Sequence, residues 1–227
     1  VGEDFDINNY SKFGIDVTGI STVRGKTTRF FQTFLTPDGQ ERDFRAERNS
    51  ETKIYIQDIP LVYLKNTKYI FLSTTLPENQ LQLIKEIRKV SKAKIAVDTL
   101  KEFSNEQVTR EVYDNADIAF IDREFERLIN SKAKIKVIKY GKTGCLYLDE
   151  NMQCIFNNKR IIPDNEVVDK TGAGDVLIGP FLAVLSKTNN PKIALEKANA
   201  TATESILQYG VEHLREKNIS VEERWKW

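Results

Sequence analysis

Short apolar runs alternate with segments of helical periodicity along the middle of the chain, and this alternation constrains the fold most. The runs typical of buried strands are residues 68–75, 94–100, 117–122 and 134–141. The helical patterns between them are residues 77–93, 104–115 and 123–132. Pro77 and Ser104 are the expected starts of the first two helices. Strands that alternate with helices predict a mostly parallel sheet with helices on both faces.

The two ends of the chain extend this pattern. Residues 13–23 are expected to contain a strand, and residues 27–46 a hairpin whose turn is Pro37–Gly39. After the central alternation we expect two short strands and two helices, at residues 145–150, 153–158, 174–188 and 191–210. No linker or repeat interrupts the sequence, so we expect a single α/β domain over residues 1–227.

Composition excludes two classes of partner. The 34 basic and 33 acidic residues give a formal net charge of +1, which is not the basic footprint of a nucleic-acid-binding protein. No apolar run approaches the roughly 20 residues that cross a bilayer. The first residues, VGEDFDINNY, lack the basic and apolar parts of a signal peptide. We therefore expect a cytoplasmic protein that binds neither nucleic acid nor membrane.

A loop of small residues precedes the first of the two C-terminal helices. Gly172, Ala173 and Gly174 follow a strand-like pair of valines and lead into a long apolar helix. Backbone N–H groups at a helix start attract anions, and the helix dipole adds to this field. Asp175 comes next and would lie near any group that attacks a bound phosphate. Because transfer of a phosphoryl group to an alcohol needs an acceptor for the hydroxyl proton, Asp175 is a candidate base.

Two alternatives compete with this interpretation. Asp175 is also an ordinary residue for the first turn of a helix, and glycines also form simple tight turns. A P-loop is a different kind of phosphate site, and the chain has Gly-Lys-Thr triplets at 25–27 and 141–143. Neither triplet has the glycine spacing of a P-loop, and the first precedes a hairpin rather than a helix. A Walker-type NTPase is therefore excluded.

Four segments together resemble the ribokinase-like (PfkB) carbohydrate kinase family. D-K-T-G-A-G-D at 169–175, followed by VLIG, is similar to the family's C-terminal signature D-T-T-G-A-G-D-x-F-x-G-A. VIKYGKTGCLYL resembles its strand–G-x-x-G–strand segment, ADIAFIDREFERL its A-D-I-…-N-x-x-E segment, and KANATATESILQYG its C-terminal helix. The order of segments matches along essentially the whole chain. The resemblance implies a ribokinase-like three-layer α/β fold.

The resemblance also implies a reaction. Family members transfer a phosphoryl group from ATP to a hydroxyl group of a sugar, a sugar phosphate or a nucleoside. Asp175 then corresponds to the catalytic base, and the N–H groups of Gly172, Ala173 and Gly174 to the anion hole. The implied small-molecule partner is a sugar or a nucleoside, and a homodimer is compatible with the family but not required.

Further positions correspond to the nucleotide and cation sites of the family. The residues expected at ATP are Lys139, Gly141, Gly144 and Asn199. Asp122 would hold Mg²⁺ through water. Asp169 and Thr171 fall where many members hold a monovalent cation such as K⁺.

Among the departures of the chain from the family, two bear most on its function. Phe125 stands where the N-x-x-E segment has its glutamate, and Asp122 stands where it has its asparagine. The family's first strand, its lid and its G-G-x-x-x-N helix have no counterpart in residues 1–227, so the chain is expected to be part of a longer kinase or a shortened relative. These departures keep open an alternative function, a catalytically inactive relative that binds a nucleotide or a sugar. The intact G-A-G-D argues against that alternative.

Overall fold

The chain forms two compact units in the computed structural model. Unit 1 comprises residues 1–52, 164–171 and 205–227, and unit 2 comprises residues 53–163 and 172–204. The structure describes residues 1–12, 14–28, 30–35, 41–47, 54–73, 76–98, 105–151, 153–156, 158 and 160–210.

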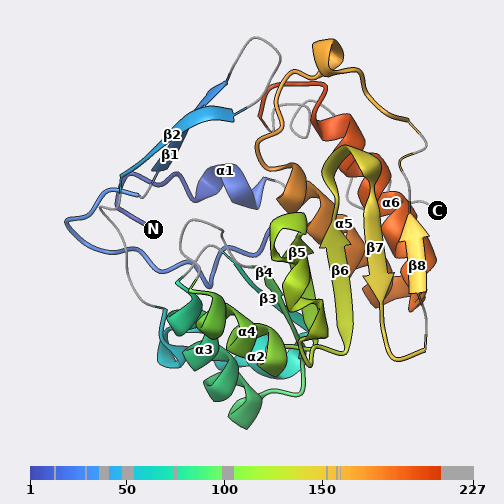
Figure 1. Cartoon of the computed structure of the whole chain (residues 1–227). Helices are drawn as coiled ribbons and strands as arrows, with labels where there is room; N and C mark the ends of the chain where they lie inside the picture. Colours follow the sequence, from blue (N-terminus) through green and yellow to red (C-terminus); the bar gives the residue numbers. More distant parts are fainter. Residues whose placement is uncertain are drawn as a thin grey trace. The chain divides into compact units, whose positions relative to one another are not determined.

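Unit 2 is built on a sheet that has six strands within the described residues, in the order β3-β4-β5-β6-β7-β8 (Figure 1). The first four strands are parallel: β3 (Tyr69–Leu72), β4 (Lys94–Asp98), β5 (Ile118–Asp122) and β6 (Ile135–Lys139). Two antiparallel strands extend the sheet, β7 (Cys145–Leu148) and β8 (Gln153–Phe156). The sheet confirms the predicted α/β fold with mostly parallel strands.

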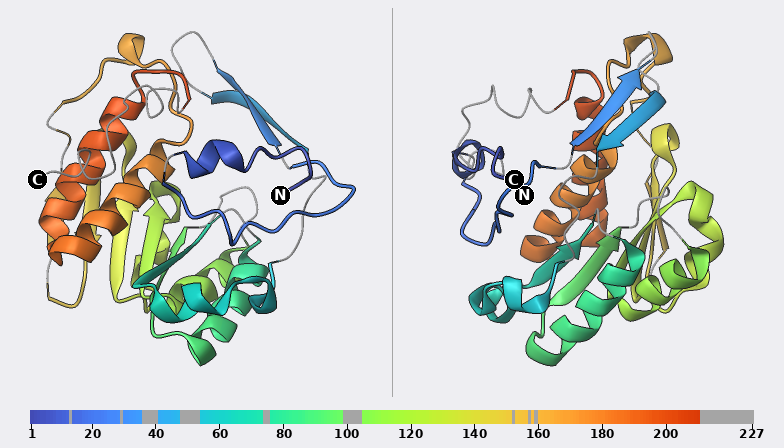
Figure 2. Two further views of the ribbon diagram at one scale, coloured as in Figure 1. Left: turned by 180° about the vertical axis from the view of Figure 1, so that it is seen from behind. Right: turned by 90° about the vertical axis from the view of Figure 1, so that its left-hand side faces the viewer.

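Helices cover both faces of this sheet, so unit 2 has three layers (Figures 1 and 2). One face carries α2 (Leu61–Asn66), α3 (Pro77–Val90) and α4 (Glu106–Asn115), which share a buried cluster with β4 and β5. The other face carries α5 (Ala173–Thr188) and α6 (Pro191–Ser205). There Phe181 of α5 packs edge-on against Phe120 of β5, with 5.6 Å between the ring centroids. Alternate residues of β5 therefore pack into two separate apolar layers, one on each face of the sheet.

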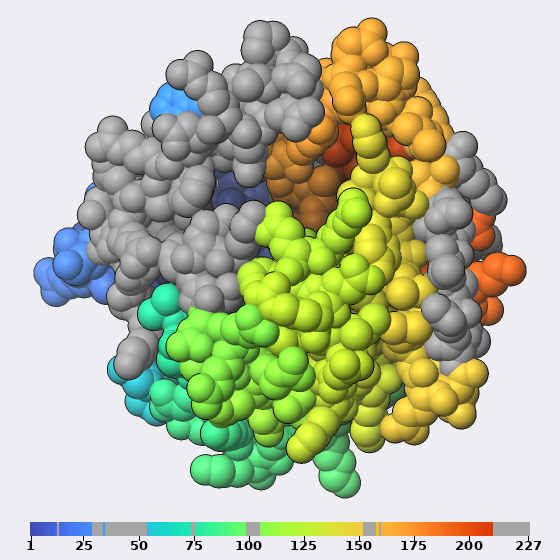
Figure 3. Space-filling model, viewed as in Figure 1, coloured from blue at the N-terminus to red at the C-terminus, as the bar shows by residue number. Residues whose placement is uncertain are grey.

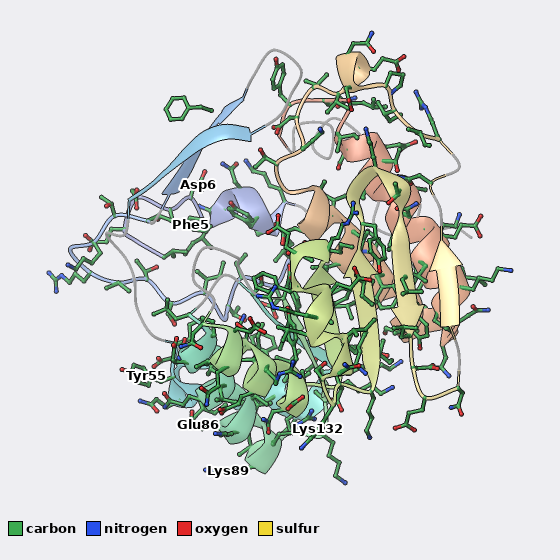
Figure 4. All side chains as sticks on the ribbon, in the orientation of Figure 1. Phe5, Asp6, Tyr55, Glu86, Lys89 and Lys132 are labelled. Atoms are coloured by element: carbon green, nitrogen blue, oxygen red, sulfur yellow. The ribbon has the colours of Figure 1, made fainter. Side chains whose placement is uncertain are left out.

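The sequence of α3 explains why this helix forms and how it packs. Pro77 occupies the first helical turn, where its missing N–H costs no hydrogen bond. Leu83, Ile84 and Ile87 recur at helical spacing and are buried against the sheet. Lys89 lies on the opposite face and points away from the strands (Figure 4). The face that α3 and α4 cover is turned toward the viewer in Figure 3.

Two of the predicted helices differ from the observed ones. Asn105, not Ser104, is the N-cap of α4, since its side chain accepts a hydrogen bond from the N–H of Gln107. Residues 123–132 were predicted to form an α-helix, but the 3₁₀-helix η3 (Arg123–Asn130) forms instead. Phe125 interrupts it with a non-helical backbone, φ −102° and ψ 15°. Its ring is buried, so core packing prevails over helix propensity at this position.

Unit 1 contains an antiparallel pair, β1 (Phe30–Leu35) and β2 (Glu41–Glu47), and the short helix α1 (Asn8–Ser11). The pair confirms the predicted hairpin, whose turn at Pro37–Gly39 lies outside the described residues. The strand expected within 13–23 was wrong: residues 14–23 form turns and irregular backbone, with one isolated bridge between Gly2 and Val23. The final helix ends at Ser205, before the predicted residue 210.

Three short 3₁₀ turns remain among the described residues, η1 (Ile56–Asp58) and η4 (Gly141–Thr143) in unit 2 and η5 (Asp164–Glu166) in unit 1. In the part of the chain that the structure describes, every helix is too short or too polar to cross a membrane.

Candidate active site

Three charged side chains stand at the last positions of three neighbouring parallel strands. Asp98 ends β4, Asp122 ends β5 and Lys139 ends β6. Because the strands are parallel, their carboxyl ends meet at one edge of the sheet, where ligands of such folds bind. Asp122 and Lys139 are also direct register partners across β5 and β6.

The Lys139 ammonium joins these side chains into one cluster. Its Nζ lies 3.1 Å and 3.0 Å from the two carboxylate oxygens of Asp98, and 3.3 Å from Oδ1 of Asp122. The side chains of Lys139 and Asp98 are both 12% exposed, whereas that of Asp122 is 43% exposed. One positive charge is thus held between a largely buried carboxylate and a more accessible one.

Burial and charge set the protonation of this cluster. Burial raises the pKa of Asp98 to about 6, an effect that Lys139 opposes and that the charges of Asp122 and Asp175 reinforce. Burial lowers the pKa of Lys139, but the two carboxylates outweigh it, and the net direction is upward. Lys139 is therefore a firmly charged ammonium, and Asp98 is only partly ionised near pH 6.

The N-terminus of α5 lies beside this ammonium. A Cβ placed on Gly174 would be 3.7 Å from Nζ of Lys139, so the lysine approaches the first turn of α5 closely. Gly172 is the N-cap, with φ 78° and ψ −1°, a left-handed conformation that glycine adopts without strain. The carbonyl of Gly172 accepts the N–H of Val176 and so begins the helix. The structure brings together the predicted Gly172–Gly174 loop and Lys139.

Asp175 is in the first turn of α5 and exposed. Its charge acts on Asp98, which places it near the same cluster. An N-terminal turn with free N–H groups and an adjacent ammonium attracts an anion, and Asp175 stands at its margin. The arrangement is suited to bind a phosphate and to accept a proton next to it.

The predicted G-x-x-G segment forms a tight turn directly after β6. The 3₁₀ turn η4 (Gly141–Thr143) is followed by Gly144, and both glycines have positive φ, 63° and 110°. The N–H of Tyr140 donates to Gly144 O at 2.9 Å, and the N–H of Gly144 donates to Gly141 O at 3.0 Å. Two non-glycine residues would be strained here, which explains the spacing of the motif.

Asn199 lies in α6 and is 4% exposed. Its side-chain amide donates a short hydrogen bond to Oδ1 of Asn158, which follows β8. The amide of Asn158 in turn donates to Lys142 O in the turn η4, at 3.0 Å. The structure thus connects the predicted residue Asn199 to the predicted G-x-x-G turn through a residue that the sequence did not indicate.

The predicted monovalent-cation residues belong to unit 1 and contact each other. Oδ1 of Asp169 accepts the N–H of Thr171 at 2.8 Å, and Oδ2 accepts the N–H of Gly210 at 3.0 Å. Partial burial opposes ionisation, but these hydrogen bonds hold the pKa of Asp169 below its usual range. Among the described residues, no group of three or more His, Cys, Asp and Glu side chains is arranged to hold a metal ion.

Sequence reasoning missed Asp98 as a site residue. The signal was present, because Asp98 closes the apolar run KIAV just as Asp122 closes IAFI. Its importance depends on the strand order, which places β4 beside β5 and β5 beside β6. Asn158 carried no comparable signal.

Comparison with known proteins agrees with this architecture. The model of the pfkB family carbohydrate kinases matches residues 1–218. This chain belongs to the pfkB family of carbohydrate kinases. The predicted family is therefore confirmed over nearly the whole length of the chain.

Relatives within and around the family include both nucleoside and sugar kinases. A cytidine kinase of Thermococcus kodakarensis is 29% identical over 192 residues, which are 76% of this chain and 66% of that protein. The ribokinase of Thermotoga maritima superposes with a TM-score of 0.73 at 21% identity, over 94% of this chain and 75% of its own. A Pyrococcus horikoshii sugar kinase, solved in complex with ATP, gives 0.75 at 21% identity, over 92% and 76%. The chain thus spans just under two thirds of the cytidine kinase that it matches.

Proposed function

We propose that the protein is an ATP-dependent kinase that phosphorylates a hydroxyl group of a nucleoside or sugar. The observation that carries this proposal is the position of the Lys139 ammonium against the first turn of α5, beside Gly174. A helix N-terminus and a firmly charged lysine together favour a group with several negative charges, such as a transferring phosphoryl group.

Each part of the cluster has a role in this proposal. The N–H groups of residues 172–174 hold the phosphoryl oxygens. Lys139 supplies positive charge beside the phosphoryl group while this group is transferred. Asp175 accepts the proton of the attacking hydroxyl. A carboxylate serves as base here because it is exposed to the acceptor and lies next to the phosphate site.

The residues also fit a magnesium ion held indirectly. Mg²⁺ keeps most of its waters and binds through one or two carboxylates together with substrate phosphates. Asp122, 43% exposed at the strand edge, offers such a carboxylate. When bound, the ion would neutralise phosphate charge. Phe125 stands at the position of the second acidic residue of the family segment and has no carboxylate, and its ring is buried in the core.

A nucleoside is the first acceptor to test, because the curated relative is a cytidine kinase. The nucleotide would lie against the turn at Gly141–Gly144 and α6, with Lys139 at the phosphate end. A monovalent cation at Asp169 and Thr171, a cytoplasmic location, a homodimer and a single kinase domain over residues 1–227 remain predictions.

The test is an ADP-release assay on the full-length natural protein with cytidine, other nucleosides and free sugars. Asp175→Asn is expected to lower kcat by about a thousandfold, within the range for a general base, with nucleotide affinity unchanged. Asp114→Asn is the matched control, since Asp114 accepts the N–H of Lys132 through an oxygen that asparagine retains. Wild-type nucleotide binding without ADP release from any acceptor would instead favour the inactive binding relative.

A further inference from the structure

Asn158 occupies a junction between three elements of unit 2. It follows β8, is half-buried, and faces both the η4 turn and α6. Its amide nitrogen donates to Lys142 O at 3.0 Å. Its amide oxygen accepts from the hydroxyl of Thr203 at 2.9 Å and from the amide of Asn199.

The α6 side of this junction is rigidly held. Asn199 is 4% exposed, and Thr203 lies one helical turn further along the same face. The Thr203 hydroxyl also lies 2.8 Å from Asn199 O, so its single proton is shared between a backbone carbonyl of α6 and the amide oxygen of Asn158. The amide of Asn199 is buried and the hydroxyl of Thr203 is half-buried, and together they fix the orientation of the Asn158 amide.

The η4 side is the part whose position matters. Internal hydrogen bonds close the turn upon itself, from Tyr140 N–H to Gly144 O and from Thr143 Oγ1 to Tyr140 O. These bonds set the shape of the turn. The bond from Asn158 to Lys142 O joins this turn to a residue whose amide oxygen accepts hydrogen bonds from α6, and so it sets where the turn lies relative to α6.

We propose that Asn158 is a positioning residue, which ties the G-x-x-G turn to α6 and so fixes the spacing between the two walls of the nucleotide site. This inference rests on the proposed function, because it assumes that the turn and α6 border the nucleotide. It gives Asn199 an indirect role: its buried amide orients Asn158 rather than contacting the nucleotide itself.

The chemistry of the amide explains why asparagine is needed here. An amide offers a donor and an acceptor at once, whereas a carboxylate only accepts. Asn158→Asp therefore keeps the acceptor for α6 and loses the donor to Lys142 O. The variant therefore removes the hydrogen bond to the turn while the hydrogen bonds from α6 remain.

The experiment compares the full-length wild type with Asn158→Asp. We expect the KM for ATP and the Kd for a non-hydrolysable ATP analogue to rise about tenfold, the factor that corresponds to one lost hydrogen bond. The kcat and the KM for the acceptor should stay within about twofold, since the lost bond orders no reacting group. Amide hydrogen exchange at residues 141–144 should rise by a similar factor, with or without nucleotide.

Asn190→Asp is the matched control. Asn190 accepts the N–H groups of Lys192 and Ile193 at the start of α6, and aspartate is an equally good N-cap. It makes the same chemical change and should leave KM and exchange unaltered. Thr203→Val removes one donor to Asn158 without adding charge, and should raise the KM for ATP about threefold even if Asn158→Asp folds poorly.

The outcomes separate the inference from the proposed function. Unchanged hydrogen exchange at residues 141–144 in Asn158→Asp would show that Asn158 does not hold the turn in place. Raised exchange with an unchanged KM for ATP would overturn the positioning role. A wild type that binds no nucleotide would refute both the proposed function and the role of Asn158 in nucleotide binding. The exchange data would still decide whether Asn158 holds the turn against α6.

Discussion

Replacement of Lys139 by methionine tests whether the Lys139 ammonium offsets the cost of burying the Asp98 carboxylate. Methionine is similar in length and apolar, so it fills the space but removes the positive charge. Asp98 then remains largely buried without its counter-ion. Its pKa is already raised to about 6 by burial, and loss of the opposing effect of Lys139 would raise it further.

The magnitude follows from the distance between the charges. At 3.0 Å between Nζ of Lys139 and Oδ2 of Asp98, Coulomb's law with an effective dielectric constant of about 20 gives an attraction of about 5 to 6 kcal/mol. Desolvation offsets part of this, and loss of one partner of a buried pair typically costs about 3 to 5 kcal/mol. We expect Lys139→Met to lower the free energy of unfolding by about 3 kcal/mol at pH 8.

The sign of the pH dependence follows from the raised pKa of Asp98. A folded carboxyl pKa above the unfolded value favours the folded state while the group is protonated, and this contribution is lost as pH rises toward the folded pKa. In the wild type the loss is nearly complete about one pH unit above the folded pKa of about 6, whereas in Lys139→Met it continues to higher pH. The difference in stability between the two proteins should therefore widen above pH 6 and be small at pH 5.

Urea unfolding of the full-length protein at pH 5 and pH 8 measures this. Lys136→Met, the same substitution earlier in the same strand, is the control and should cost about the same at both pH values, because Lys136 forms no ion pair with a carboxylate among the residues that the structure describes. The double variant with Asp98→Asn should recover most of the loss at pH 8. Equal losses at both pH values, or additive losses in the double variant, would refute the reasoning.

Two glycines of the candidate anion site should respond in opposite ways. Gly172→Ala forces an L-residue to φ 78° and should lower the free energy of unfolding by about 1 kcal/mol, measurable by urea titration. Gly174→Ala should leave stability unchanged or higher, since alanine favours helices and its Cβ meets Lys139 at an ordinary 3.7 Å. Its methyl group covers the anion site, so the Kd for ATP should rise about tenfold by calorimetry; an unchanged Kd would contradict the proposed site.

The layered fold of unit 2 was predictable because its elements have clean periodicity. The alternation of buried runs and helical stripes over residues 68–141 predicted the four parallel strands and the helices α3 and α4, whereas a 3₁₀-helix forms in place of the third predicted α-helix. The strand expected within 13–23 failed for the opposite reason: Val17, Ile20 and Val23 are spread among glycines and polar residues, and the backbone forms turns there. Local apolar content without a partner strand does not define a strand.

The candidate site was only half predictable. The loop at 172–174 is recognisable from its glycine spacing, and Lys139 was expected from the resemblance of its segment to the family. Asp98 becomes significant only when the strand order places it next to Lys139, 41 residues away in sequence. Asn158 is similarly 41 residues from Asn199. An amide that bridges two distant elements leaves no pattern in the segment that contains it.

The division of the chain into two units has a consequence for how the protein folds. The two units are assembled from five alternating segments, so the polypeptide passes between them four times, and one passage falls between Thr171 and Gly172. Neither unit is a continuous stretch, and disorder in one would release the ends of the segments that form the other. The units should therefore melt together, in a single cooperative transition whose calorimetric and van't Hoff enthalpies agree.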